Sequence, residues 1–404
     1  MNNTFEFIGK IVPCKETDKF KPYSDKRFNN SDWAKKQIKF NMVCGNNRHF
    51  VESSCLYNAA HTDAMTIYTV SKGTTSDSGE KTKGEKMEIP FKDRTKTAII
   101  EKVAEFKKFV VDTEVPKRRY NLEKAIDKFK DGSITDEQME SLGIHSIEDC
   151  EKALEESKKK RHEFISEYDF VDFLNKLVHN DKIKDMIFKV SGEYTLEYNE
   201  KDDVWYRKYA VNRIYRVEND TETKSEMTLG FVFDRNAVDD ENFDATKKYR
   251  VNGYVSQYLS TYKKSFFCPM TLTIDSNGDE KAQKKADAFK KKFDFADDNE
   301  REYREIGLVC SVLDGAQKVE LTEDMLTEEQ RENLEYGLIT MADIQRELGK
   351  DIYGEKITDI VMSSLARGFS GGAKDTEYTK KDFGKPCVES NDDDENIFDE
   401  DDVI

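Results

Sequence analysis

Two periods of apolar residues divide this chain, and this division constrains its fold more than any other feature of the sequence. In residues 35–44 the apolar side chains alternate strictly, with Ile38 and Phe40 on one face. A period of two residues is that of a β-strand with one buried face. Beyond about residue 94 the spacing becomes helical, and at Ile187 the alternation returns. We therefore expect an α+β fold, with β-rich regions on both sides of a helical block.

Short strand-like segments make up the two β-rich regions, residues 1–91 and 187–275. In the first region they lie at 5–14, 35–44, 48–57, 65–71 and 86–91, and in the second at 188–198, 204–217, 227–234, 249–259 and 266–275. Five short strands separated by turn signals are typical of a small antiparallel barrel of the OB type. We expect such an OB-like barrel over the second region. The first region forms either an incomplete OB-like barrel or part of one sheet with the second.

The block between these regions, residues 92–186, is expected to be a large helical insertion. Its first apolar stripe has helical spacing, and it consists of Ile99, Val103, Phe106 and Val110. Pro116 should end this first helix, because proline has no backbone N–H to continue the hydrogen bonding.

The C-terminal part of the chain is expected to be a mixed helical region, residues 276–386, followed by a disordered acidic tail, residues 387–404. The mixed region should contain a basic helix at 279–293 and a strand pair at 305–313 and 316–321. Further helices should continue through Arg367.

Charge and cysteine content exclude several classes of protein. The net charge is −17, and the eight acidic residues among the last fourteen account for nearly half of it. Any site for a polyanion must therefore be local. The seven cysteines form no C-x-x-C pair and are expected to be reduced thiols in a cytoplasm. We expect no zinc site, no signal peptide and no transmembrane helix.

Residues 204–217 interleave aromatic and basic side chains and contain no acidic one. On a strand, one face would carry Trp205, Arg207, Tyr209, Arg213 and Tyr215. Lys208 and Arg216 add charge on the other face. Unpaired bases stack on flat rings while cations neutralise the phosphates between them, so this segment predicts a single-stranded nucleic-acid site. The alternative is a barrel strand whose rings are core and whose arginines extend outward.

A second basic and aromatic segment lies at residues 15–39. It includes Trp33, Lys35 and Lys39, and Arg48 follows it. We expect these four residues to flank the site on the central strand. A solvated loop with extended lysines is the alternative.

The last fourteen residues contain eight acids and no base, so they cannot fold alone. Such a tail can dock into a groove of a partner protein, or lie in its own protein's anion-binding groove and compete with a polyanion. It can also act only as a solubilising tail. The residues expected to bind partners are Asp392, Asp393, Asp394, Phe398, Asp401, Asp402 and Ile404.

Signatures of catalysis are weak. Gly368 to Gly372 match G-x-S-x-G, yet no histidine follows Ser370 to complete a hydrolase triad. No phosphate-binding loop, dinucleotide fingerprint or zinc-protease motif occurs. We therefore expect no enzymatic activity, no cofactor and no metal, with a metal-dependent nuclease built from distant carboxylates as an alternative.

The chain resembles the single-stranded DNA-binding proteins encoded by bacteriophages. The resemblance rests on FEFIGKIVPCKETDKFKPY at the start, on QIKFNMVCG, on WYRKYAVNRIYRV and on the acidic tail. It implies an OB-type barrel that coats single strands during phage DNA replication or recombination in the cytoplasm of a bacterial host. It also implies that the tail recruits replication or recombination proteins. A phage structural or host-takeover protein that binds other proteins is an alternative.

Overall fold

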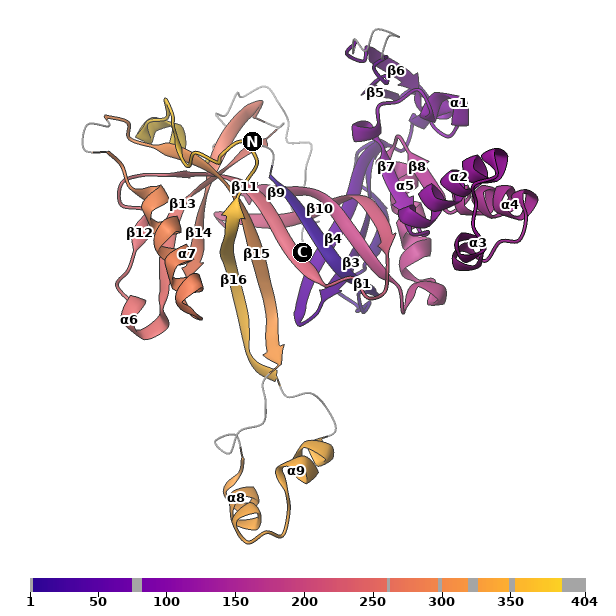
Figure 1. Cartoon of the computed structure of the whole chain (residues 1–404). Coiled ribbons are helices and arrows are strands. Elements are labelled where there is room, and N and C mark those ends of the chain that lie inside the picture. Colours follow the sequence, from indigo (N-terminus) through magenta and orange to yellow (C-terminus); the bar gives the residue numbers. More distant parts are fainter. Residues whose placement is uncertain are drawn as a thin grey trace.

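The computed structural model has an α+β fold and describes residues 3–74, 82–259, 262–296, 300–318, 326–348 and 353–386 (Figure 1). Most strands belong to one large mixed sheet, in which strands from both β-rich regions pair with one another. A separate two-stranded sheet consists of β5 (Thr66–Val70) and β6 (Lys86–Pro90). Of the two arrangements left open for residues 1–91, the strand pairing supports a sheet shared with residues 187–275.

Five strands pair in a closed circuit, here termed the first ring. They are β1 (Thr4–Pro13), β3 (Trp33–Cys44), β4 (Asn47–Asn58), β9 (Ile187–Asn199) and β10 (Val204–Val217). β1 pairs with β3 and β9, β3 with β4, and β9 with β10, all antiparallel. β4 closes the circuit by running parallel to β10, with Glu52 level with Ala210. The short β2 (Tyr23–Arg27) pairs with β3 outside the ring.

A helix packs against the first ring and lies, in sequence, between its third and fourth strands. This helix, α5 (Glu167–Val178), is capped by Ser166, whose hydroxyl accepts a hydrogen bond from the backbone of Tyr168. It buries Phe170 and Leu174 in the same hydrophobic cluster as the inward side chains of the ring. Because α5 follows a long insertion, the sequence pattern does not distinguish it from the rest of the helical block.

A second ring repeats this strand order. Its strands are β11 (Lys224–Phe233), β13 (Lys248–Leu259), β14 (Lys264–Asp275), β15 (Arg304–Lys318) and β16 (Tyr353–Leu365). β11 pairs with β13 and β15, β13 with β14, and β15 with β16, all antiparallel, while β14 runs parallel to β16. Helix α7 (Glu280–Lys290) again lies between the third and fourth strands, and it buries Ala286 and Phe289.

The two rings are joined into one body. β1 pairs antiparallel with β11, from Thr4 opposite Thr228 to Ile8 opposite Lys224. One hydrophobic cluster runs through both rings and includes Phe7 of the first and Phe231 of the second. Three smaller elements lie outside the closed circuit of the second ring: β12 (Val238–Asp239), α6 (Phe243–Thr246) and β17 (Lys374–Asp375). The expected boundaries at residues 91, 186 and 275 therefore do not separate the sheet, because each ring draws strands from both sides of a boundary.

The insertion between β4 and α5 lies to one side of the first ring (Figure 1). Besides β5 and β6 it contains α1 (Thr97–Ile100), β7 (Phe109–Asp112), α2 (Pro116–Asp131), α3 (Asp136–Leu142), α4 (Ile147–Lys158) and β8 (Arg161–Phe164). Helices α2 to α4 have their own core of Leu122, Ile144 and Cys150. β7 runs parallel to β10 and so attaches the insertion to the first ring.

The predicted helix over Ile99 to Val110 is wrong. The α-helix α1 ends at Ile100, and a single 3-10 turn follows at Glu105–Lys107. Val103 is buried beside Ile89, and Val110 belongs to strand β7. Pro116 does not end a helix but begins α2, where a missing N–H is harmless.

The predicted strand pair at 305–313 and 316–321 is also wrong. Residues 304–318 form the single strand β15, which pairs with β11 and β16. β15 and β16 project from the second ring as a long hairpin, and α8 (Glu328–Glu335) and α9 (Met341–Leu348) lie beyond its end (Figure 1). Among the helices of the described residues, none has both the length and the apolar character needed to cross a membrane.

Candidate nucleic-acid interface

Aromatic and basic side chains share the outer face of β3 and β4. Because Ile38 and Phe40 point into the ring and are fully buried, the alternate positions of β3 point outward. Across the ladder, Phe50 of β4 lies opposite Asn41 of β3. Trp33 and Phe50 each expose 43% of their surface. This surface, here termed the β3–β4 face, consists of Trp33, Lys35, Lys39, Arg48, Phe50 and Leu56.

Positive charge is concentrated beside this face. Lys208 of β10 reaches it because β10 runs parallel to β4. The ammonium groups of Lys39 and Lys208 each lie 3.8 Å from the carboxylate of Glu52, and Lys208 also pairs with Glu197. Burial lowers the pKa of Lys208. Attraction by Glu52 raises this pKa, and repulsion from Lys35 and Lys39 lowers it further. A bound phosphate would relieve the repulsion among these lysines.

The aromatic ring of Phe50 lies near one ammonium group and one other aromatic ring. The Lys39 ammonium is 5.7 Å from its centroid, and the ring of Phe20 lies 5.9 Å away. An exposed ring bordered by cations offers an unpaired base a stacking surface and its phosphate a counter-charge.

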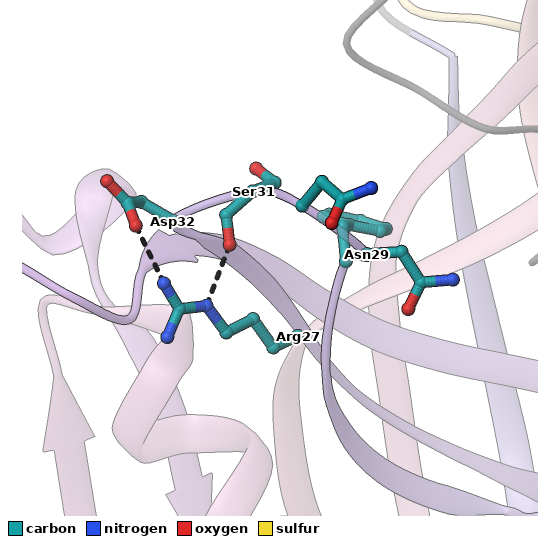
Figure 2. A pocket seen from close by; sticks show the side chains of 6 residues that line it. Arg27, Asn29, Ser31 and Asp32 are labelled. Atoms are coloured by element: carbon teal, nitrogen blue, oxygen red, sulfur yellow. Dashed lines mark hydrogen bonds and ion pairs between the residues drawn. The ribbon is translucent and has the colours of Figure 1, made fainter.

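A short turn fixes the start of β3 next to this face (Figure 2). The guanidinium of Arg27 donates to the backbone oxygen of Ser31 at 2.7 Å and to the carboxylate of Asp32 at 2.6 Å. The backbone N–H of Phe28 donates to the carbonyl of Trp33 at 3.0 Å. Residues 27–32 line an open hollow of about 500 Å³. The turn thus fixes the backbone of Trp33 at the end of the β3–β4 face.

Strand β10 does not present the expected row of exposed rings and guanidinium groups. The ring of Tyr209 lies 4.9 Å from Phe7 and 5.2 Å from Phe5, in the core, and burial raises the pKa of its hydroxyl. Trp205 is half-buried, 5.2 Å from the ring of Tyr198. The prediction of one exposed face is wrong in its geometry, because Tyr209 points into the ring, while Arg207 on the same side of β10 is exposed.

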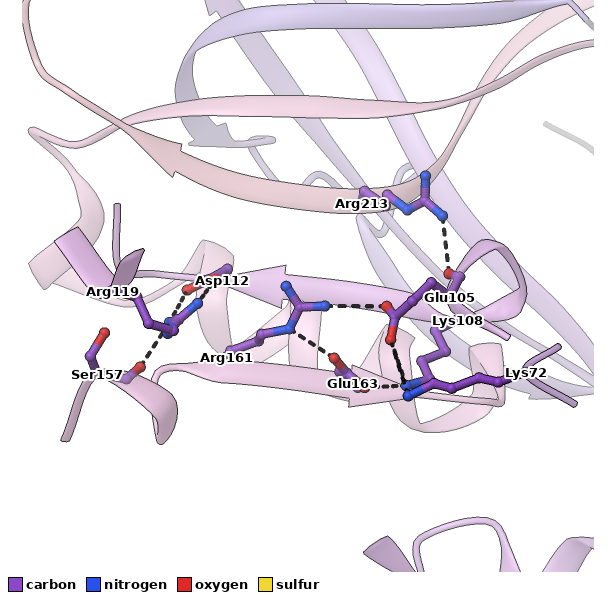
Figure 3. Close-up of polar contacts among 9 residues, drawn as sticks. All are labelled: Lys72, Glu105, Lys108, Asp112, Arg119, Ser157, Arg161, Glu163 and Arg213. Carbon is purple, nitrogen blue, oxygen red and sulfur yellow. Dashed lines mark hydrogen bonds and ion pairs between the residues drawn. The ribbon is translucent and has the colours of Figure 1, made fainter. Parts of the chain in front are cut away.

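The C-terminal half of β10 is directed toward the insertion. Arg213 donates to the backbone oxygen of Glu105 at 3.1 Å (Figure 3). Tyr215 lies opposite Asp112 of β7, and both Tyr215 and Arg216 are half-buried. A register shift in the middle of the β9–β10 ladder separates these three residues from Lys208. They do not join the β3–β4 face.

Ion pairs connect elements of the insertion to one another next to β10 (Figure 3). Arg161 and Lys108 donate to Glu163 at 2.8 and 2.5 Å. Arg119 donates to both carboxylate oxygens of Asp112, which is fully buried, at 2.7 and 3.0 Å. These ion pairs link β7, β8 and α2, and so they stabilise the insertion.

Arg207 extends toward the second ring. Its exposed side chain lines a cleft of about 330 Å³ together with Arg250, Thr271 and Asp359. Of the side chains predicted on β10, only Lys208 therefore borders the β3–β4 face.

Two residues of this face, Phe50 and Leu56, are absent from the set predicted from the sequence. Gly45, Asn46 and Asn47 signal a tight turn between two alternating segments. Pairing those segments as a hairpin would have placed Phe50 on the same side as Lys39.

The predicted tail residues Asp392, Asp393, Asp394, Phe398, Asp401, Asp402 and Ile404 lie outside the described residues. Within the described residues, no group of three or more His, Cys, Asp or Glu side chains is placed to hold a metal ion.

No family model matches the chain, and no curated protein matches its sequence. One solved structure with a match is a deletion mutant of the single-stranded DNA-binding protein from Thermus aquaticus. The match covers 81% of this chain and 98% of that chain, at 9% sequence identity and a TM-score of 0.29.

Proposed function

We propose that this protein binds single-stranded DNA on the β3–β4 face, with little sequence preference and without catalysis. The observation that carries the proposal is the exposure of Trp33 and Phe50 on one face with Lys35, Lys39 and Arg48. Stacking on a ring is tolerant of sequence because every base has a flat face, and the cations between the rings neutralise phosphates.

The strand order supports the same proposal. We infer that each ring is a barrel of the OB type, because five strands pair in a closed circuit with one parallel contact and a helix before the fourth strand. Such barrels bind oligonucleotides on the face of their second and third strands and with the flanking loops. In the first ring the second and third strands are β3 and β4.

The loop between β1 and β3 extends the proposed surface. Lys15, Lys19 and Lys21 are exposed on it, and Phe20 contacts Phe50. Two acids, Glu16 and Asp18, lie among these lysines, so its charge is only mildly positive. A local positive surface on a protein of net charge −17 favours binding that depends strongly on salt.

The biological setting remains a prediction from the resemblance. It comprises a phage origin, replication or recombination as the process, a bacterial cytoplasm as the location and recruitment of partner proteins by the acidic tail.

The test substitutes the two exposed rings. Trp33→Ala and Phe50→Ala should each weaken binding of a labelled oligo(dT), measured by fluorescence anisotropy, by roughly 1–3 kcal/mol, or about 5- to 150-fold. Tyr68→Ala is the matched control, because Tyr68 is also an aromatic strand residue, 74% exposed, but lies in the insertion.

The two tryptophans allow a second readout. Trp205→Phe leaves Trp33 as the only indole, so oligo(dT) should still quench the fluorescence. Unchanged affinity in both alanine variants contradicts the proposed face. Loss of quenching in Trp205→Phe contradicts it as well, because the quenching would then come from Trp205 and not from Trp33.

A further inference from the structure

The second ring has a counterpart of the β3–β4 face on its own second and third strands. Val251 and Leu272 point into the ring and are fully buried, so the alternate positions of β13 and β14 point outward. These positions, here termed the β13–β14 face, are Arg250, Asn252, Tyr254, Phe267, Pro269 and Thr271. Two hollows of about 330 and 220 Å³ lie along this face and share Pro269, Met270 and Thr271.

One end of the face is basic. Arg207 from the first ring and Arg250 line the larger hollow. Asp359 also lines it, but this carboxylate is bound by Arg250 at 2.9 Å and lies 3.6 Å from the ammonium of Lys248. Asp234 lines the smaller hollow. The larger hollow therefore retains an excess of positive charge.

The middle of the face is polar. The Thr271 hydroxyl donates to the Asn252 side-chain oxygen at 2.7 Å, and both side chains are exposed. Amide and hydroxyl groups of this kind can hydrogen-bond the edge of a base.

The other end is aromatic, and a C-terminal segment covers it. Tyr254, Phe267 and Tyr303 form a cluster on this surface. The half-buried ring of Phe383 lies 4.5 Å from Tyr254 and 4.4 Å from Phe267. It stacks on Tyr303 with centroids 4.2 Å apart and planes at 25°. The covering segment, residues 374–386, is here termed the strap.

We propose that the β13–β14 face is a second binding surface for unpaired nucleotides, and that Phe383 occupies its base-stacking position in the free protein. The inference rests on the proposed function. Cations, hydrogen-bonding groups and stacked rings follow one another along this face, as a nucleotide chain requires.

The contacts at the end of the strap are easily exchanged. Its first part is anchored by pairing of β17 with β15 and by the ion pair of Asp375 with Arg304 at 3.0 Å. Its last part is held by the exposed ion pair of Lys385 with Asp203, and such pairs stabilise a fold by only about 0–1 kcal/mol. Between these two parts, Arg301 pairs with Glu377 at 2.6 Å and the backbone N–H of Lys380 donates to Glu302 at 3.1 Å. The ring of Phe383 itself is held by stacking, which a base can replace.

The test measures how much DNA one molecule covers. Tryptophan fluorescence is titrated with oligo(dT) of increasing length for the unsubstituted protein, Phe383→Ala and the double variant Phe383→Ala/Tyr254→Ala. We expect Phe383→Ala to bind long oligo(dT) several-fold more tightly than the unsubstituted protein. We expect no such increase in the double variant. Short oligo(dT), which is long enough to cover only the β3–β4 face, should bind all three proteins equally.

A second measurement uses the unsubstituted protein and so does not depend on how the variants fold. Long oligo(dT) containing 5-iodouracil should photocrosslink to residues of the β13–β14 face, with Tyr254 among them, and short oligo(dT) should not. Binding with no crosslink to this face, or no increase in affinity for folded Phe383→Ala, overturns the second surface. Absence of any single-strand binding overturns the proposed function instead.

Discussion

Single side chains in the first ring link its stability to pH, and His49 does so most directly. It lies on β4 with only 1% of its surface exposed. Its ring stacks on Phe7 at 4.2 Å, and Nε2 lies 2.8 Å from the hydroxyl of Ser225. Burial lowers the pKa of His49 from 6.5 to about 4, because the apolar core disfavours the charged imidazolium.

The expected consequence is a loss of stability in mild acid. Because the pKa is lower in the folded state, this contribution is complete above pH 6.5 and is lost as the pH falls through 4. The full loss from this group is on the order of 3 kcal/mol. Urea unfolding between pH 7 and pH 4 should show that His49→Gln is less sensitive to acid than the unsubstituted protein. His179→Gln, at an exposed histidine, is the control, and equal acid sensitivity in all three proteins contradicts the assignment.

At this scale the sequence predicts part of the candidate site. Trp33, Lys35, Lys39 and Arg48 lie on one exposed face because strict alternation separates inward from outward side chains. The prediction for Tyr209 is wrong, because its ring lies inside the first ring of strands. Alternation defines two faces but does not say which one is the interior, and aromatic rings suit both.

Among elements, the insertion illustrates how a segment can be stable without forming the site. Helices α2 to α4 have their own core, and Arg119 joins α2 to β7 through the buried Asp112. Removing one partner of a buried ion pair costs about 3–5 kcal/mol, because the other charge remains buried.

Arg119→Met should therefore loosen the insertion and leave DNA binding intact. Hydrogen exchange should accelerate in α2 to α4, while oligo(dT) affinity stays within about twofold. Lys124→Met removes an exposed ion pair with Asp127 and should change neither. A fall in affinity that parallels the opening of the insertion contradicts the location of the site on β3 and β4.

Strands are easier to predict than the ends of the helical block. β1, β3, β4, β9, β10, β11, β13 and β14 all lie in segments where alternation or β-forming residues are evident. The helix predicted where β16 lies is wrong, because Ile357, Ile360 and Val361 happen to have helical spacing. As a strand that pairs with both β14 and β15, β16 is buried at successive positions such as Asp359 and Ile360, and clean alternation is absent.

For the molecule as a whole, the sequence pattern does not predict that the strands of each ring pair in a closed circuit. The first ring is closed by β4 and β10, which are separated in sequence by the whole insertion and α5. Local periodicity carries no information about such distant pairing. The same holds for the charge: a net −17 conceals the cluster of Lys35, Lys39 and Lys208, which only the strand order brings together.

The most direct test of single-strand binding on the β3–β4 face is a salt titration of oligo(dT) affinity, compared with duplex DNA. We expect affinity for the single strand to fall steeply with salt and to exceed affinity for the duplex. Lys35→Gln/Lys39→Gln/Arg48→Gln should reduce the slope of log K against log salt by about 0.7 for each phosphate that the variant no longer neutralises. Equal binding of duplex and single strand, or an unchanged slope in the triple variant, would contradict the claim.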